Sequence, residues 1–335
     1  MDYKITVTIP CHNSESTIKR CINSVINQTI GFENIELILY DNASSDSTRK
    51  IIQDYANKFD NIRIFFSDTD SGFPGTGRNK GIQEASSKYI MFIDSDDEYD
   101  PNICELYYNE MESTNVDVIT CKFNNIDDVN NRFIKNDEKS LEKIRIDKDV
   151  LYFNEFMIWN KIYKKSILKE NNLLFPDDSY GEDFYFCKLY LLHCNSLILF
   201  SNYYGYNRFV QIESKSRNWE LSELTEILNL NQKMYNELLE YHNIDYSRLY
   251  REQIQSYIYK LYSLNILNNK SEIIEFLKKL SEFELNIGFD ENLGMIQNMA
   301  NKLILKKKFN SCYYYLKCVK KIYDSKRLRG IYRFF

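Results

Sequence analysis

Glycine and proline are scarce in this chain of 335 residues, which contains 10 of the first and 4 of the second. Average usage of glycine, roughly 7%, would give more than twice that number. The scarcity excludes collagen-like proteins and low-complexity segments rich in Pro and Gly. In contrast, 21 Phe and 27 Tyr supply ample apolar surface for a folded core. The length indicates about two ordinary domains of a globular protein.

Metal-binding cysteine motifs and membrane-spanning runs are also missing. The eight cysteines form no CxxC pair and no Cys/His cluster with zinc spacing, so we expect free thiols. No stretch reaches the roughly 18 apolar residues of a spanning helix. The first ten residues lead straight into a strand pattern, without the long apolar core of a secretory signal. These features predict a cytoplasmic protein.

The charge is unevenly distributed along the chain. The net charge is −5, so no global excess of positive charge recruits nucleic acid, and we expect no nucleic-acid partner. From residue 300 to the end, however, eleven basic residues stand against a single acid, Asp324. Aromatic and aliphatic residues interleave with these bases. This basic tail fits either peripheral contact with the inner face of the plasma membrane or a solvated helix face.

Strand and helix patterns alternate through the first hundred residues. Continuous apolar runs separated by helically spaced apolar residues are typical of a parallel sheet that is covered on both faces. We therefore predict an α/β fold whose mostly parallel, Rossmann-like sheet is flanked by helices. The expected strands are 4–9, 35–40, 62–66 and 89–93, and the expected helices are 16–27, 47–59 and 77–86.

The second half of the chain has a different pattern. The polar segment 124–148 is expected to form a loop or lid with little core of its own. Beyond residue 216 the pattern becomes helical, with amphipathic helices expected at 222–241, 246–267, 271–283 and 292–305. We therefore divide the chain into a domain over 1–215, with halves 1–100 and 101–215, and an all-helical region over 216–335.

Polar residues follow three of the expected strands, at 10–13, 41–46 and 94–97. Ligands bind at the carboxyl ends of such strands, so these segments predict one shared site. Asp94 and Asp96, one residue apart, could share Mg²⁺ or Mn²⁺, although a helix cap or a solvated turn would use the same residues. Asp41 could accept a hydrogen bond from a base or ribose. Asp46 and its neighbouring serines are more typical of helix capping.

Two further segments are candidates for binding and catalysis. Four of the ten glycines fall within residues 72–81, where Arg78 could meet a phosphate or a base edge. Glu182 and Asp183 follow Gly181 and form a carboxylate pair. One of the pair could be a general base that the other orients, or both could simply begin a helix.

Eight motifs in order carry a family resemblance. They are VTIPCHN (7–13), CINSVINQT (21–29), DNASSDS (41–47), GRNKG (77–81), IDSDD (93–97), WNKIY (159–163), GEDF (181–184) and YYGYNR (203–208). Together they resemble the family 2 glycosyltransferases with the GT-A fold over about residues 1–215. His12 stands where the family usually has Tyr, and Asn42 and Ala43 replace its usual Asp-Gly.

The resemblance implies an inverting sugar transfer from a nucleotide-diphosphate sugar, most simply a UDP-sugar. It implies a divalent cation, Mn²⁺ or Mg²⁺, held by Asp96 and Asp94. Asp183 would be the base that deprotonates the acceptor hydroxyl, with Glu182 helping to bind a sugar. The acceptor would be a cell-surface glycan, a glycolipid or a glycoprotein.

The remaining donor-side residues would be Pro10, His12, Asn13, Asp41, Arg78 and Ser95, and those near the acceptor or diphosphate would be Trp159, Lys161 and Arg208.

Two other functions share some of these features. A nucleotidyltransferase has a similar sheet and acidic metal site, but should carry a Gly-rich basic loop after its first strand, which residues 10–14 lack. A non-catalytic nucleotide-sugar-binding module would not need Asp96 and Asp183. The helical region could shape an acceptor site or form a homo-oligomer interface.

Overall fold

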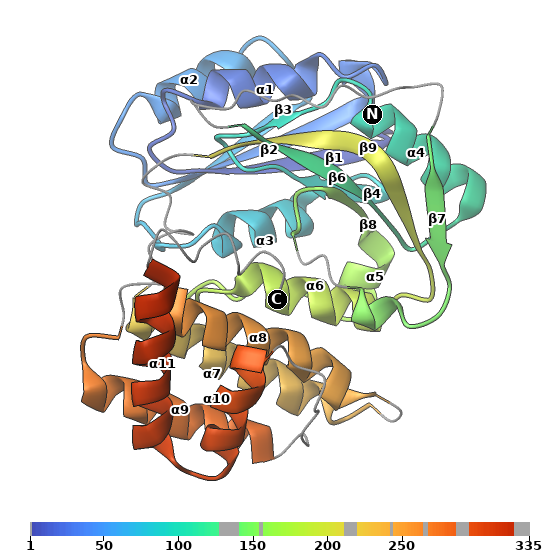
Figure 1. Cartoon of the computed structure of the whole chain (residues 1–335). Helices are drawn as coiled ribbons and strands as arrows, with labels where there is room; N and C mark the ends of the chain where they lie inside the picture. Colours follow the sequence, from blue (N-terminus) through green and yellow to red (C-terminus); the bar gives the residue numbers. More distant parts are fainter. Residues whose placement is uncertain are drawn as a thin grey trace. The chain divides into compact units, whose positions relative to one another are not determined.

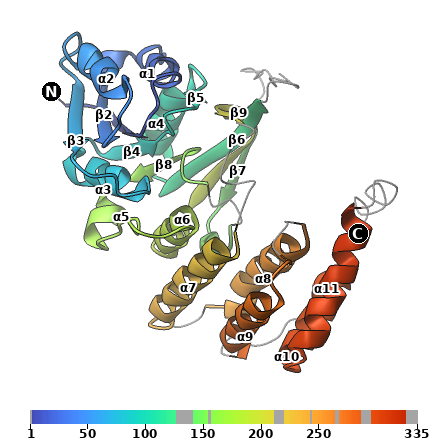
Figure 2. The ribbon, with the colours of Figure 1, turned by 90° about the vertical axis from the view of Figure 1, so that its left-hand side faces the viewer.

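The computed structural model describes residues 2–126, 141–153, 157–210, 220–241, 244–263, 267–285 and 295–324. The chain divides into two compact units, Met1–Ile212 and Glu213–Phe335. The first unit contains a sheet with helices on both of its faces (Figure 1). The second is built from helices (Figure 2).

The sheet of the first unit is parallel at one side and mixed at the other. Its strands follow the order β3-β2-β1-β4-β8-β6-β9-β5, and β7 pairs with β9. The pairs among β1 to β4 are parallel, whereas β8 lies antiparallel to both β4 and β6. The strands are β1 (Ile5–Cys11), β2 (Ile35–Asn42), β3 (Ile62–Ser67), β4 (Tyr89–Phe92), β5 (Glu98–Tyr99), β6 (Val118–Ile126), β7 (Lys143–Ile146), β8 (Lys161–Lys164) and β9 (Leu197–Phe209).

Helices cover both faces of this sheet, with α1 and α2 on one face and α3 and α6 on the other (Figure 1). Every residue of β1 and β2 is therefore buried, as continuous apolar strands between two helix layers require. The helices of this unit are α1 (Ile18–Ile26), α2 (Thr48–Ala56), α3 (Gly75–Glu84), α4 (Ile103–Thr114), α5 (Lys165–Glu170) and α6 (Glu182–Leu192).

The four strands and three helices expected in the first hundred residues are all present, each within three residues of its predicted ends. The prediction of a loop over 124–148 is wrong at both of its ends. Residues 124–126 complete β6, and 143–146 form β7, which pairs antiparallel with β9. The middle of that segment lies outside the described residues. β7 has the sequence KIRI, and three of its four residues are exposed, so its alternation of basic and apolar residues is too short and too exposed to stand out in a polar segment.

The second unit consists of α7 (Leu221–Leu238), α8 (Tyr246–Ser263), α9 (Lys270–Leu285), α10 (Met295–Leu305) and α11 (Phe309–Asp324). Four of these helices correspond to those expected from the sequence, and α11 lies within the segment described there only as a basic tail. All eight cysteines are free thiols; seven are buried and Cys318 on α11 is exposed. Within the described ranges, no helix is both long and apolar enough to cross a membrane.

Candidate active site

The loops that follow β1, β2 and β4 are joined by hydrogen bonds at one edge of the sheet. The backbone N–H of Asn13 donates to Ser44 Oγ at 2.9 Å, and that of Ser14 donates to Thr48 Oγ1 at 2.7 Å. The hydroxyls of Ser14 and Ser95 lie 2.8 Å apart. The polar segments after these strands therefore meet at one edge, as the parallel topology predicts.

Asp41 lies at the end of β2 with its side chain fully buried. Its Oδ2 accepts hydrogen bonds from Arg49 Nε at 2.8 Å and from the backbone N–H of Ser44 at 3.3 Å. Its Oδ1 is buried and has no hydrogen-bond partner among the described residues. A buried carboxylate oxygen without a donor is costly, so a hydrogen-bond donor that reached Oδ1 would stabilise it.

Beside Asp41, a network organises the Gly-rich loop, and sequence reasoning missed it. Asp70 Oδ1 accepts hydrogen bonds from Asn42 Nδ2 and from the backbone N–H of Gly72, both at 2.8 Å. Its Oδ2 lies 3.7 Å from Nε2 of His12, and His12 Nδ1 lies 2.7 Å from the Asn42 carbonyl oxygen. Asn42, seen in the sequence only as a departure from the family pattern, therefore links the end of β2 to the loop before α3.

Arg78 on α3 joins three carboxylates that are far apart in the sequence. Its Nη2 donates to Asp94 Oδ1 at 2.9 Å, and its Nη1 donates to Asp183 Oδ1 at 2.7 Å and to Glu182 Oε1 at 3.2 Å. The Arg78 side chain is only 3% exposed. Burial alone would lower the pKa of this guanidinium, but the charges of Asp183, Asp94 and Glu182 raise it. Arg78 is therefore a permanent cation at the centre of the site.

Close packing of α3 against the sheet fixes the position of Arg78. A Cβ atom at Gly77 would lie 3.0 Å from the Cβ of Pro10 and 2.9 Å from the ring of Tyr40. A Cβ at Gly81 would overlap the side chain of Thr8. The glycines therefore let the helix approach β1 and β2 more closely than any other residue would permit. Pro10 contributes to the site as part of this packed floor.

Asp183 and Glu182 form the first turn of α6. Burial raises the pKa of Asp183 above its usual range, and the charges of Glu182 and Asp94 raise it further, whereas Arg78 and Lys161 lower it. Its side chain nevertheless remains 32% exposed, so it can reach a ligand. A carboxylate with a raised pKa and partial access to solvent suits a general base.

Asp94 and Asp96, the two carboxylates expected to share a divalent cation, follow β4. Burial and the charge of Asp94 raise the pKa of Asp96 to about 6, which a bound cation would reverse. No group of three or more His, Cys, Asp or Glu side chains in the described residues could hold a metal ion. Two carboxylates fit Mg²⁺ or Mn²⁺ if the remaining ligands are oxygens of water and of the diphosphate.

Asp97 is not available for that role. Its Oδ2 accepts a hydrogen bond from the Tyr206 hydroxyl at 2.6 Å and its Oδ1 accepts one from the Phe209 N–H at 2.8 Å. These bonds tie the end of β4 to β9 and so place Asp94 and Asp96. Sequence reasoning missed the roles of Asp97 and Tyr206, because their pairing spans more than a hundred residues.

The three residues expected near the acceptor or diphosphate lie at different depths. Trp159 is buried, stacked on Tyr206 with ring centroids 4.0 Å apart and packed edge-on against Phe123. Lys161 is 1% exposed, and its Nζ donates to the Met157 carbonyl at 2.5 Å and to Asn160 Oδ1 at 3.0 Å. These two side chains are therefore packed within the protein and are not exposed to a ligand. Arg208 on β9 is partly exposed, and its charge lowers the pKa of Asp96.

Asp46 has the capping role expected from the sequence. Its Oδ1 accepts a hydrogen bond from the N–H of Thr48, the first residue of α2, at 2.9 Å. Its Oδ2 accepts one from the N–H of Glu15 at 3.0 Å. The capping interpretation is confirmed, and the same carboxylate also joins the loops after β1 and β2.

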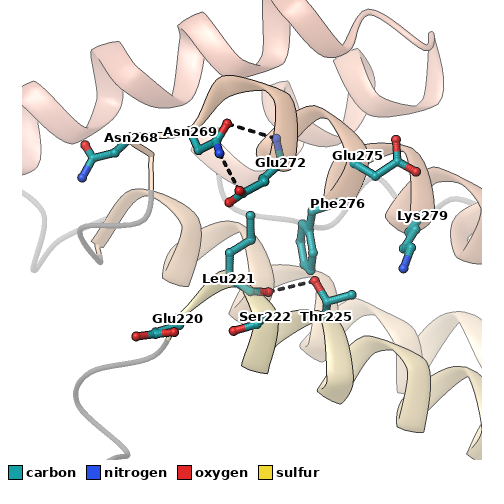
Figure 3. Close-up of a pocket in the computed structure, with 10 residues that line it drawn as sticks. All are labelled: Glu220, Leu221, Ser222, Thr225, Asn268, Asn269, Glu272, Glu275, Phe276 and Lys279. Carbon is teal, nitrogen blue, oxygen red and sulfur yellow. Dashed lines mark hydrogen bonds between the residues drawn. The ribbon is translucent and has the colours of Figure 1, made fainter.

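A cavity of about 550 Å³ lies between α7 and α9 in the second unit. It is lined by Leu221, Phe276 and polar side chains that include Asn269 and Glu272, which are hydrogen-bonded to each other (Figure 3). None of the site residues expected from the sequence lines this cavity.

The chain is similar in sequence to two named transferases over part of its length. The poly(ribitol-phosphate) beta-glucosyltransferase of Bacillus spizizenii is 34% identical over 177 residues, 52% of this chain and 27% of that protein. The poly(ribitol-phosphate) beta-N-acetylglucosaminyltransferase TarS of Staphylococcus aureus is 28% identical over 212 residues, 61% of this chain and 36% of that protein. The chain thus spans about a third or less of the length of these relatives.

The fold has a counterpart among solved structures. The crystal structure of S. aureus TarS 1-349 in complex with UDP-GlcNAc superposes with a TM-score of 0.77 at 19% identity, covering 95% of this chain and 92% of the other. This likeness confirms the expected GT-A type of fold with helices after it. The model of the family "Glycosyl transferase family 2" matches residues 6–189. Since this match covers more than half of the chain, the protein belongs to glycosyl transferase family 2.

Proposed function

We propose that the protein transfers a sugar, with inversion, from a UDP-sugar to a hydroxyl of a cell-surface glycan. The observation that carries this proposal is the position of Arg78, which holds Asp94 at the end of β4 next to Glu182 and Asp183 at the start of α6. Asp94, which would help to bind the cation, and Asp183, whose pKa is raised, are thus hydrogen-bonded to the same buried guanidinium. A single in-line displacement needs these two functions close together.

The donor would bind at the strand ends. The unpartnered Oδ1 of Asp41 fits the ring N–H of a uracil base, and His12 and Asn13 border the same edge. Asp94 and Asp96 would hold the divalent cation, which would neutralise the diphosphate as it leaves. Ser95 would remain tied to Ser14 and keep this loop in place.

In the transfer, Asp183 would take the proton from the acceptor hydroxyl as its oxygen bonds to the anomeric carbon. The bond between that carbon and the diphosphate breaks in the same step, and UDP leaves with the electron pair. Arg78 keeps Asp183 oriented, and its positive charge opposes the rise in the pKa of Asp183 that burial causes. Glu182 would contact a sugar hydroxyl from the same turn of α6.

The names of the relatives support a narrower acceptor class. Two of them act on poly(ribitol-phosphate), so we propose a polyol-phosphate polymer or a related surface glycan as the acceptor. The full chain should release UDP from one of the common UDP-sugars in the presence of Mn²⁺ or Mg²⁺ and poly(ribitol-phosphate). NMR of the product should show the anomeric configuration opposite to that of the donor. The proposal fails if no UDP-sugar is hydrolysed or transferred, and a UDP-sugar that then still raises the melting temperature would indicate binding alone.

A non-catalytic nucleotide-sugar-binding module is the second candidate, because the buried Oδ1 of Asp41 would serve binding alone equally well. Such a module would bind UDP without releasing it from any donor. The loop over residues 10–14 has no Gly-rich basic run, which disfavours a nucleotidyltransferase.

A further inference from the structure

The α10–α11 hairpin presents exposed apolar side chains next to exposed lysines. On α10, Met295 and Met299 are 76% and 50% exposed, and the exposed Lys302 follows three residues later on the same side of the helix. The exposed Lys306 lies four residues beyond Lys302, in the turn after α10, where its N–H donates to the Lys302 carbonyl. The spacing therefore places both methionines and Lys302 along one side of the helix, and Lys306 follows at its end.

A matching stripe runs along α11. Tyr314 is 56% exposed and Ile322 is 40% exposed, and the exposed Lys317, Cys318 and Lys321 lie between them. The opposite side of α11 is the buried one, with Cys312 and Leu316 in the core. The stripe is thus an outer surface of this helical unit.

Hydrogen bonds hold α10 against α11. The Tyr315 hydroxyl donates to the Ile296 carbonyl at 3.4 Å, and the Cys312 thiol donates to the Ala300 carbonyl at 3.7 Å. The buried side chains of Ala300 and Ile304 fill the space within the hairpin. We define the hairpin face as Met295, Met299, Lys302, Lys306, Tyr314, Lys317, Lys321 and Ile322.

The charge of this segment is almost entirely positive. Residues 295–324 contain seven lysines and one acid, Asp324, which is paired with Lys320 at 3.2 Å. No carboxylate in the described ranges forms an ion pair with the lysines of the hairpin face. A surface with this composition is complementary to an anionic partner.

We infer that the hairpin face docks on an anionic phospholipid membrane. Met, Tyr and Ile side chains can enter the boundary between the lipid headgroups and the acyl chains. The aliphatic part of each lysine side chain can lie along this boundary while its ammonium group reaches a lipid phosphate. A soluble polyanion would use the lysines but would leave the exposed methionines in water. The mixture of apolar and basic side chains therefore favours a lipid surface, and the inference extends beyond the proposed transfer reaction.

Flotation with vesicles tests this inference on the full chain. Binding should be stronger to vesicles of phosphatidylcholine mixed with phosphatidylglycerol than to phosphatidylcholine alone, and it should weaken as salt is added. Replacing Lys302, Lys306, Lys317 and Lys321 together by Gln should weaken binding by more than about tenfold. Replacing Met295 and Met299 by Ser should weaken binding even at low salt.

Four exposed lysines of the first unit provide the matched control, and circular dichroism checks that every variant is folded. Changing Lys19, Lys50, Lys58 and Lys169 to Gln removes the same charge and should leave binding within about twofold. Equal binding to both kinds of vesicle, or an equal loss in the control, would overturn the inference. The inference would also be overturned if light scattering showed that the chain is a dimer and that the Met295 and Met299 changes dissociate it. Binding to inorganic polyphosphate without binding to vesicles would overturn it as well. No sugar nucleotide is present, so the result is independent of the proposed activity.

Discussion

Nη1 of Arg78 lies 2.7 Å from Oδ1 of Asp183, so an arginine from α3 holds the carboxylate that begins α6. The two residues are 105 positions apart in the sequence. Through its other nitrogen, Arg78 also holds Asp94. The candidate base and the candidate metal-binding carboxylate thus share one cation, which makes their properties interdependent.

Changing Asp183 to Asn should abolish transfer while leaving donor binding intact. The amide keeps the size of the side chain but cannot accept the acceptor proton, and general bases contribute about 10²–10⁴-fold to rate. UDP release should measure the loss, and calorimetry should show unchanged affinity for UDP. Activity equal to that of the unchanged chain would rule out Asp183 as the base. The Glu182→Gln variant serves as the comparison and should retain part of the activity.

Removing Arg78 should shift the pH dependence of the reaction. Its positive charge lowers the pKa of Asp183, so the Arg78→Ala variant should have a higher pKa at that carboxyl and the acid limb of kcat/KM should move to higher pH. Loss of one partner from this buried cluster should also destabilise the fold by about 3–5 kcal/mol. Arg78→Lys keeps the charge and should move the acid limb less. An acid limb unchanged in both variants would contradict the coupling.

Changing Asp96 to Ala should lower the affinity for UDP only when a divalent cation is present. The side chain is proposed to bind the cation, which in turn binds the diphosphate, so affinity in EDTA should be the same as in the unchanged chain. Titrations with and without Mn²⁺ measure the difference, which we expect to be at least tenfold, about 1.4 kcal/mol. Asp54→Asn on the exposed surface of α2 is the control. If metal-dependent binding survives in Asp96→Ala, the metal assignment is wrong.

Changing Ala43 to Gly should stabilise the protein. Ala43 has a φ of 56°, in the left-handed region that costs a residue with a Cβ roughly 1–2 kcal/mol, and the family pattern has Gly there. Relief of this strain is partly offset by the greater freedom of Gly in the unfolded chain. We therefore expect urea unfolding to show a free energy of unfolding higher by about 0.5–1 kcal/mol. The same change at Ala56, which ends α2, should destabilise instead. If both variants had a lower free energy of unfolding than the unchanged chain, the backbone at Ala43 would not be strained.

The first four strands could be predicted because each is a continuous apolar run between helices. Their arrangement then brought the polar residues after β1, β2 and β4 to one edge, and the structure joins those residues by hydrogen bonds. Local pattern was sufficient for these features, because a buried parallel strand and its amphipathic neighbours are recognisable from a few residues each.

Long-range pairing explains what the sequence could not show. Arg78 was expected to meet a phosphate or a base, whereas its two Nη atoms are bonded to three carboxylates, one after β4 and two at the start of α6. Trp159 was expected to offer its ring to a sugar, whereas Tyr206 stacks on it. The contacts of Arg78 and Trp159 depend on which distant segments pack together in the fold. No local sequence pattern shows which segments those are.

The distribution of the thiols has a practical consequence. Seven of the eight cysteines are buried and Cys318 is exposed, so a maleimide dye added to the native chain should react at one position. That position lies between Lys317 and Val319 on α11, on the same outer surface as the hairpin face. An environment-sensitive dye there would change its emission when lipid approaches, without any engineered cysteine.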